Sequence, residues 1–355
     1  MRLDRFHPPP RSPLAGVLAL VALSLFTSCA TPSPEVWQRH EFTRPEMGLP
    51  FRIVLHAPDR LTAVTAAEAA FARIHELNDV FSDYEYDSEL SRLSRTAGSG
   101  QQVPVSDDLW EVLARSQALA RRSQGAFDIT VGPYVNLWRR ARRLQQVPAP
   151  EWLERARATV GYQRLLLDRR HQTAELLVPN MRLDLGGIAK GYAVDEAMTI
   201  LRGRGIRSAL VGGGGDMAAS APPPGRKGWR IAVAPLDAPE APPERHVLLS
   251  HRAIATSGDL SQRLEIDGKR YSHIVDPRTG LGLTHHTLVT VIAKDCTTAD
   301  ALATTVSVLG PERGVAFVKG ARGAALHLVG KPAGRIETAD AGGFDHYYEA
   351  EANAP

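Results

Sequence analysis

The chain has 355 residues, of which 43% are hydrophobic, which is enough for one large domain or two small ones with a substantial core. Its 42 basic and 39 acidic residues nearly balance, and no helix-turn-helix, zinc-finger or aromatic RNA-binding motif organises the basic ones, which excludes a nucleic-acid-binding protein. Only two cysteines occur, Cys29 and Cys296, and with Cys29 lipidated, as predicted below, no disulfide framework is possible.

The first thirty residues have the pattern of an export signal. Three arginines precede an apolar run over residues 14–26, which is shorter than the ~20 residues that a membrane-spanning helix needs. Small residues then come directly before Cys29, as in a bacterial lipobox. We therefore predict a lipoprotein signal peptide over residues 1–28, a lipid on Cys29 and a flexible tether over residues 29–41, and so an extracytoplasmic protein on the periplasmic side, anchored to a bacterial membrane. The alternative is an ordinary signal peptide with an incidental cysteine.

Residues 42–350 are predicted to form a single domain, because no second linker, repeat or low-complexity block interrupts them. Hydrophobic periodicity in the first half predicts, in chain order, a strand at 51–56, helices at 61–81 and 107–123, and short strands at 165–167, 175–178, 182–185 and 208–211. Four arginines between residues 139 and 143 are interpreted as the solvated face of a helix.

The second half continues with strands. The pattern predicts strands at 229–234, 247–250, 263–266 and 288–293, helices at 298–309 and 312–319, and a strand at 325–329. Two proline-rich segments, 222–224 and 239–243, are predicted to be loops because proline cannot donate to a strand ladder. Strands and helices do not alternate regularly, so the predicted fold class is α+β, a mixed and mainly antiparallel sheet with packed helices.

The strongest local motif runs from Asp184 to Asp195, DLGGIAKGYAVD. An apolar segment ends at two glycines and a helix begins, so backbone N–H groups and the positive end of the helix are presented with little obstruction, which suits a phosphate. Lys190 falls in the first helical turn. The alternative is a tight turn with a surface lysine, because the motif matches neither the P-loop nor the dinucleotide fingerprint. A second glycine-rich turn, at 212–215, is predicted either to admit a cofactor or to close a hairpin.

Asp300 and Thr304 stand four residues apart on a predicted helix and therefore project from one face. They offer two hard oxygen ligands of the kind that Mg²⁺ prefers. Taken alone, an aspartate and a threonine at this spacing are more often capping or solvated residues. Cys296, just before them in an apolar neighbourhood, is interpreted as a buried structural thiol.

Two further segments carry polar turns, and two carry aromatic rings. Residues 271–280 contain His273 and an Asp-Pro turn, and residues 255–259 are predicted to be a loop of small residues. Residues 81–84 and 125–133 supply rings able to stack on a flat ligand.

Taken together and in this order, the segments resemble the ApbE family, the FAD:protein FMN transferases, from Met47 to about Gly310. The matching motifs are Phe81-Ser82 with Ser88-Glu89-Leu90-Ser91, GAFDITVGP from Gly125, DLGGIAKGYAVD from Asp184, ATSGD from Ala255, HIVDPRTG from His273 and ADALAT from Ala299. The chain departs from the family at Leu49, where threonine is usual, and at Gly215-Asp216-Met217, where a more apolar or amide-bearing run is common.

The resemblance implies a set of site residues. The positions that match FAD contacts are Met47, Tyr84, Ala126, Phe127, Asp128, Asp184, Lys190 and Ile274. The positions that match Mg²⁺ ligands are Gly187, through its carbonyl, and Asp300 and Thr304, through their side chains. The catalytic candidates are His273 for proton handling, Lys190 for electrostatic stabilisation and Asp300 as a metal ligand.

The implied reaction is Mg²⁺-dependent transfer of FMN from FAD to a serine or threonine hydroxyl of an acceptor protein, with AMP released. The implied acceptors are extracytoplasmic redox proteins, reached from a lipid anchor on Cys29. Two alternatives stay open: a FAD pyrophosphatase, in which water replaces the acceptor, and a non-catalytic flavin-binding lipoprotein.

Overall fold

The computed structural model describes residues 37–236, 245–258 and 263–350. The chain divides into two units, Met1–Val36 and Trp37–Pro355, and the second contains every described residue. The predicted signal peptide, Cys29 and the proline-rich segment 239–243 lie outside the described residues. Among the residues described, no helix combines the length and apolar composition of a membrane span.

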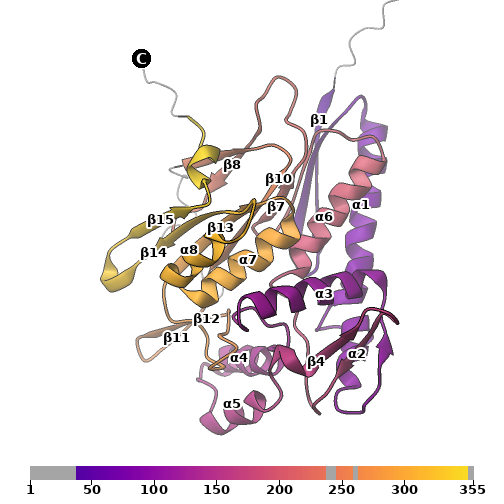
Figure 1. The fold of residues 1–355 in the computed structure, drawn as a ribbon. Coiled ribbons are helices and arrows are strands. Elements are labelled where there is room, and N and C mark those ends of the chain that lie inside the picture. The colour runs from indigo at the N-terminus through magenta and orange to yellow at the C-terminus, as the bar shows by residue number, and fades with distance from the viewer. Residues whose placement is uncertain (1–36, 237–244, 259–262, 351–355) are drawn as a thin grey trace, which may run out of the picture. The chain divides into compact units, whose positions relative to one another are not determined.

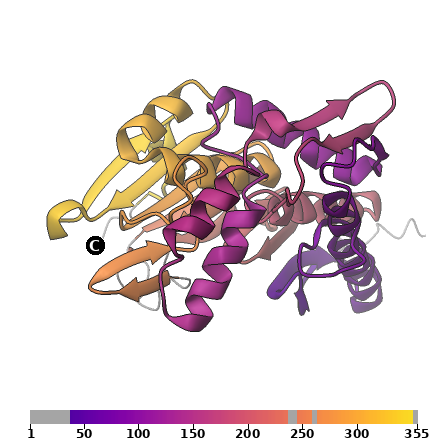
Figure 2. The same cartoon turned by 90° about the horizontal axis from the view of Figure 1, so that it is seen from below.

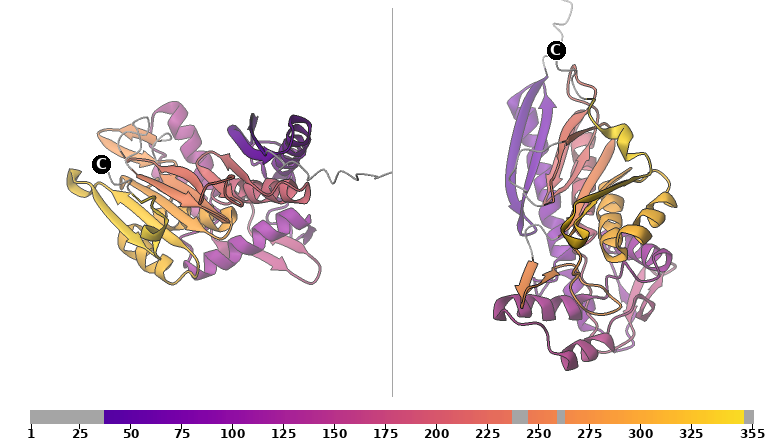
Figure 3. Two further views of the ribbon diagram at one scale, coloured as in Figure 1. Left: turned by 90° about the horizontal axis from the view of Figure 1, so that it is seen from above. Right: turned by 90° about the vertical axis from the view of Figure 1, so that its left-hand side faces the viewer.

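An eight-stranded sheet forms the centre of the fold, in the order β1-β2-β6-β7-β10-β13-β14-β15, and each neighbouring pair is antiparallel. Its strands are β1 (Gln38–Glu46), β2 (Leu49–Ala57), β6 (Ala209–Gly213), β7 (Asp216–Ala219), β10 (Arg252–Gly258), β13 (Thr287–Ala293), β14 (Ala325–Gly330) and β15 (Glu337–Ala341). β1 and β15 therefore lie at opposite edges (Figure 3). The predicted α+β class with a mainly antiparallel sheet is confirmed.

Some helices cover one face of this sheet, and others, among them the fourth and fifth, lie beyond its lower end (Figure 1). The helices are α1 (Arg60–Phe81), α2 (Glu89–Arg95), α3 (Asp107–Arg122), α4 (Gly132–Leu144), α5 (Pro150–Arg157), α6 (Ala189–Gly203), α7 (Cys296–Leu309) and α8 (Pro311–Lys319), with short 3-10 turns η1 (Tyr162–Arg164), η2 (Pro332–Gly334) and η3 (Phe344–Tyr347). α1 presents small alanines to α6, and its larger side chains, Phe71, Ile74 and Leu77, are fully buried in the main core.

The small sheets complete the layers. The hairpin β8 (Trp229–Val233) with β9 (Arg245–Leu249) contributes Trp229 and Val247 to an apolar cluster that also takes side chains from β2, β10 and β13. The other small sheets are β3 (Val103–Pro104), β5 (Thr173–Leu176) and β4 (Leu165–Asp168), and the hairpin β11 (Arg263–Ile266) with β12 (Lys269–Ser272). Because apolar partners lie on both faces, all seven residues of β13 are buried.

Three differences from the predicted elements have local causes. β1 begins at Gln38, inside the segment predicted as a tether, so the fold starts before residue 42. Residues 182–185 are not a ladder strand, because the amide of Leu183 donates to Ser94 and that of Asp184 to Ile129. Residues 252–258, predicted in part as a loop, form strand β10, which pairs with neighbours on both sides.

Candidate functional site

The glycine turn before α6 is folded by its own side chains. Asp184 accepts a hydrogen bond from the amide of Gly186 at 2.8 Å, and Lys190 donates to the carbonyl of the same glycine at 2.9 Å. α6 then begins at Ala189, and no side chain caps its N-terminus. The motif places a helix N-terminus behind two glycines, as predicted, and the positive end of the helix attracts an anion. The predicted free amides are only partly present, because those of Gly186 and Gly191 donate to Asp184 and Asp300.

The ammonium of Lys190 lies between two buried carboxylates. Its Nζ atom is 3.1 Å from Oδ2 of Asp300 and 3.1 Å from Oδ2 of Asp216. Burial lowers the pKa of Lys190, but the two carboxylates outweigh burial and hold this pKa well above its usual value. Burial and the neighbouring Asp300 raise the pKa of Asp216 to about 7, against the opposing effect of Lys190. Lys190 therefore faces the carboxylates and fixes the position of Asp300.

Asp216 belongs to this cluster although its motif stands out only as a departure from the family pattern. It is the first residue of β7, directly after the glycine turn at 212–215, which closes the β6–β7 hairpin. The hairpin alternative for that turn is confirmed, and the hairpin places the Asp216 carboxylate, 3% exposed, against Lys190. The signal in the sequence was an aspartate next to glycines that permit a tight turn.

Thr304 and Gly187 meet across the interface between α7 and the glycine turn. A Cβ atom on Gly187 would lie 2.9 Å from the Thr304 hydroxyl oxygen, so any larger residue would displace the Thr304 side chain. Thr305 and Ser307 donate to carbonyls one helical turn earlier, whereas the Thr304 hydroxyl has no hydrogen-bond partner among the described residues. Together with Asp300, held at Oδ2 by Lys190 and by the amide of Gly191 at 3.2 Å, Thr304 gives a set of hard oxygen donors that fits Mg²⁺.

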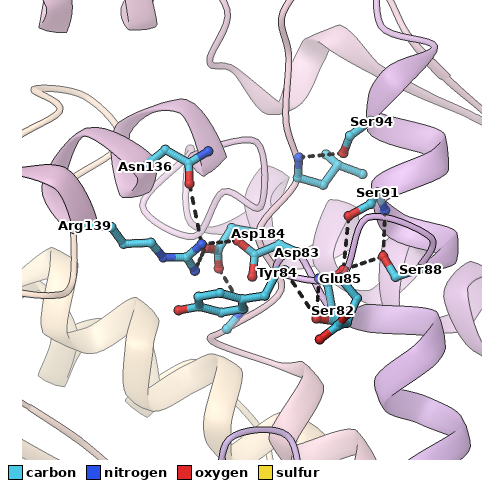
Figure 4. Close-up of polar contacts among 12 residues, drawn as sticks. Ser82, Asp83, Tyr84, Glu85, Ser88, Ser91, Ser94, Asn136, Arg139 and Asp184 are labelled. Carbon is cyan, nitrogen blue, oxygen red and sulfur yellow. Dashed lines mark hydrogen bonds and ion pairs between the residues drawn. The ribbon is translucent and has the colours of Figure 1, made fainter.

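A second group of residues surrounds Tyr84, beyond the C-terminal end of α1 (Figure 4). Arg139 of α4 bridges two carboxylates: it donates to Asp83, and its Nη2 atom lies 3.3 Å from Oδ2 of Asp184. Its guanidinium also stacks on the ring of Tyr84, 4.1 Å from the centroid. Burial and the nearby Asp83 raise the pKa of Asp184, and Arg139 opposes this shift.

Arg139 was missed by sequence reasoning, which placed it on a solvated face. Its side chain is 20% exposed, whereas Arg140 and Arg143 on the same helix are exposed as predicted. Tyr84 itself is 75% exposed, so one face of its ring remains open to a flat ligand while Arg139 covers the other.

The loop after β12 carries two predicted residues. Ile274 packs with Ala126, Leu283 and Val308 in a small apolar cluster, so the structure brings the predicted contacts Ala126 and Ile274 together. His273 precedes Ile274 in this loop and is half-buried. The loop is held against α4, since Trp138 donates to the carbonyl of Gly280 at 2.8 Å. Figure 2 shows α4 and α5 lying side by side at this lower end.

Phe127 and Asp128 do not present their side chains to a ligand. The ring of Phe127 is 3% exposed and belongs to the main core, so the prediction that it stacks on a flat ring is wrong. The carboxylate of Asp128 accepts hydrogen bonds from the amides of Thr130 and Tyr162, both at 2.8 Å. At these two positions only the backbone remains for a flavin contact.

Met47 lies at the tip of the β1–β2 hairpin, where it adopts φ +50°. Leu49, two residues after Met47 in the hairpin, reaches the second glycine turn, because a Cβ on Gly214 would lie 2.6 Å from the Cδ1 atom of Leu49. The same Cβ would lie 3.8 Å from Cδ of Lys190. The hairpin tip is therefore adjacent to the carboxylate cluster, and the FAD contact of Met47 stays a prediction.

Asp195, the last residue of the motif, joins α6 to α7. Its carboxylate accepts hydrogen bonds from the amides of Cys296 and Thr297, both at 2.8 Å, and from the Thr297 hydroxyl at 2.6 Å. It thereby caps α7, the helix that carries Asp300 and Thr304. Cys296 is fully buried, as predicted, and burial raises the pKa of its thiol well above the usual range.

Comparison with known proteins gives one consistent result. The model of the ApbE family matches residues 47–327. A FAD:protein FMN transferase of Vibrio cholerae is 34% identical over 307 residues, covering 85% of this chain and 90% of that protein. The FAD:protein FMN transferase of Escherichia coli K12 is 30% identical over 346 residues, covering 95% of this chain and 98% of that protein.

Solved structures agree with the sequence comparison. The flavin transferase ApbE from Vibrio cholerae superimposes with a TM-score of 0.79 at 32% identity, over 88% of this chain and 99% of that one. The apo flavinyl transferase ApbE of Pseudomonas stutzeri gives a TM-score of 0.78 at 33% identity, over 88% and 98%. By family model, relatives and fold alike, this chain belongs to the ApbE family.

Proposed function

We propose that this protein transfers FMN from FAD to a serine or threonine hydroxyl of an acceptor protein, with Mg²⁺ bound at Asp300, Thr304 and the Gly187 carbonyl. The observation that carries the proposal is the oxygen-donor centre at the N-terminus of α6, next to an open tyrosine ring. Its relatives named FAD:protein FMN transferases support the same activity. An anion-attracting helix end beside hard cation ligands is suited to a diphosphate.

In the proposed complex the diphosphate of FAD lies at the glycine turn, and its flavin ring lies near Tyr84 and Ile274. The acceptor hydroxyl attacks the phosphorus on the FMN side, the bond to AMP breaks, and AMP leaves. When bound, Mg²⁺ neutralises negative charge on the diphosphate. The N-terminus of α6, which no side chain caps, adds electrostatic stabilisation.

The chain's own residues hold this arrangement. Lys190 and the Gly191 amide both bind Oδ2 of Asp300, which orients this carboxylate before any ligand arrives. Arg139 keeps Asp83 and Asp184 together behind Tyr84. His273 is the proposed acceptor of the hydroxyl proton, and Asp300 is assigned to the metal and not to this proton.

The proposed setting is extracytoplasmic. The apolar run before Cys29 and the small residues next to it support export and lipidation of this cysteine. A lipid anchor would keep the enzyme on the surface where membrane redox proteins display their flavin-attachment sites, which raises the effective concentration of the acceptor.

The test is the intact mass of an acceptor domain carrying an Ala-Thr flavinylation motif, after incubation with FAD, Mg²⁺ and this protein. We expect a mass gain equal to one esterified FMN with the wild type, and none with Asp300→Asn or Thr304→Val. Thr298→Val, on the same helix, is the matched control and retains activity. Release of free FMN and AMP with an unmodified acceptor would indicate a pyrophosphatase, and flavin binding without any turnover would indicate a binding protein.

A further inference from the structure

The end of the eight-stranded sheet opposite the flavin site can be traced by backbone hydrogen bonds. At this end the first residue of β1, Gln38, pairs with Ala57. The amide of His56 donates to the Ser208 carbonyl at 2.9 Å, and the amide of His251 donates to the Ser220 carbonyl at 3.1 Å.

The same row continues to the next strands. Arg252 pairs with Ala219, and Ala253 pairs with Ala293, the residue before Lys294. Met47, Gly214 and Asp216 lie at the other end, at the β1–β2 and β6–β7 turns. The connection that follows the C-terminus of α6 lies at the same end of the sheet as Gln38, because the carbonyl of Arg207 accepts a hydrogen bond from the amide of Ala221 at 3.2 Å.

Exposed basic side chains gather at this first end, which we call the basic end. Its members are Arg202, Arg204, Arg207, His251 and Lys294. None of them forms an ion pair with another described residue. Their positions follow from the ends of α6, β7 and β13, so they come together only in the folded protein.

The acidic side chains nearby are already engaged. Asp195 binds the amides that begin α7, Glu196 binds Arg73 at 2.8 Å, and Asp295 binds Arg115 at 3.2 Å. Between the α6 C-terminal half and the strand ends lies a groove, whose lining contains Arg115, Arg202, Arg252 and Lys294 together with these three carboxylates. These carboxylates are held by other groups, so the five basic side chains of the basic end stay available to an external anion.

We propose that the basic end docks on a membrane surface of anionic phospholipids. The predicted lipid on Cys29 favours a lipid surface over another anionic partner, because few residues separate Cys29 from this end of the fold. The described fold begins at Trp37 and Gln38, at this end of the sheet. Residues 29–36 span at most about 28 Å when fully extended, so a lipid on Cys29 would keep this end close to the headgroups.

Docking in this orientation has a geometric consequence for the reaction. The nine residues of β1 rise by about 30 Å from the basic end to the hairpin that carries Met47. The flavin site would face away from the membrane, toward acceptor domains that project from it. The biological setting rests on the proposed lipidation of Cys29, whereas the charge of the surface does not.

The experiment uses the chain from residue 30, which lacks the lipidated cysteine. It retains the whole unit from Trp37, and a solved relative consists almost entirely of the matching portion, so this form is expected to fold. Sedimentation with vesicles of phosphatidylcholine alone is compared with vesicles that also contain about 30% phosphatidylglycerol, at low and at physiological salt. We expect binding to the anionic vesicles only, weakened by salt.

A charge-matched pair of variants tests which surface binds. Arg202→Gln with Arg204→Gln and Lys294→Gln should weaken binding about 100-fold, since each basic residue near an anionic surface contributes about a fivefold factor. The control, Arg140→Gln with Arg143→Gln and Arg169→Gln, removes the same charge from exposed positions elsewhere and should change binding less than about threefold.

Three results would overturn the proposal: absence of binding at low salt, equal loss in both triple variants, or competition by inorganic phosphate beyond that of sodium chloride at equal ionic strength. The last result would indicate a site for a soluble phosphate in the groove. Mass analysis of Cys29 in the exported protein tests the lipid anchor separately. The anchor and the basic surface can therefore be confirmed or rejected independently.

Discussion

Replacing Gly191 by alanine is expected to separate α6 from α7. A Cβ atom at this position would lie 2.4 Å from the carbonyl oxygen of Cys296 and 2.9 Å from the Cα of Thr297. Both atoms are backbone, so they can move only with α7. To restore a normal contact of about 3.5 Å, the helices must part by about 1 Å.

The free-energy balance is unfavourable. Overpacking of this kind costs about 1–3 kcal/mol or more, and alanine recovers only about 1 kcal/mol of helix propensity. Because the clash is with backbone atoms, we take the upper half of this range and expect Gly191→Ala to lower the free energy of unfolding by about 1–2 kcal/mol. The same shift would pull Asp300 from the Gly191 amide, so FMN transfer should fall as well.

Gly203→Ala is the matched control on the same helix. No heavy atom lies within 4 Å of its added Cβ, so this variant should be as stable as the wild type or more stable by about 0.5–1 kcal/mol. Urea denaturation followed by circular dichroism measures both: the midpoint should fall for Gly191→Ala and should stay unchanged or rise for Gly203→Ala. A Gly191→Ala protein with an unchanged or higher midpoint would refute the packing argument.

Three further substitutions test other contacts. Gly187→Ala should displace Thr304 and reduce the transfer rate at least about tenfold, while the free energy of unfolding changes by less than about 1 kcal/mol because the half-buried Thr304 can move. A melting curve and the acceptor-mass assay measure the two effects, and an unchanged rate would contradict the prediction. Arg139→Gln should raise the dissociation constant for FAD about tenfold, because one guanidinium holds Asp83, Asp184 and the Tyr84 ring. Flavin fluorescence measures this constant, and an unaltered affinity would show that Arg139 is not part of the flavin site. Asp195→Ala removes three hydrogen bonds to the start of α7 and should lower the free energy of unfolding by about 3 kcal/mol. Urea denaturation measures this loss, and a value below about 1 kcal/mol would show that water replaces the carboxylate.

The long periodic elements were predictable from the sequence. Residues 61–81 and 107–123 correspond to α1 and α3, because each repeats apolar residues at helical spacing and follows a capping side chain, Asp59 or Ser106. β10 was not recognised, since Ala255, Thr256, Ser257 and Gly258 have a loop composition. They form a strand because both neighbouring strands supply hydrogen bonds, which no local pattern encodes.

The candidate site divides in the same way. The motif around Lys190 and the helix with Asp300 and Thr304 could be found locally, because each set lies on one turn or one helix face. The pairing of Arg139 with Asp83 and Asp184 joins positions 56 and 45 residues apart, so a run of arginines looked solvated. The prediction for Phe127 was wrong in the opposite direction: its ring was expected to face a ligand, and it is buried in the main core.

The strand order also determines when the central sheet can form during synthesis of the chain. β2 pairs with β6, and about 150 residues separate these two strands in the chain. At roughly 5–20 residues per second, the ribosome makes the β1–β2 hairpin about 8–30 s before its partner strand. During that interval the β2 edge exposes unpaired backbone groups beside apolar side chains such as Phe51, Ile53 and Leu55. Chains are thus open to pairing with one another until β6 is free to pair with β2.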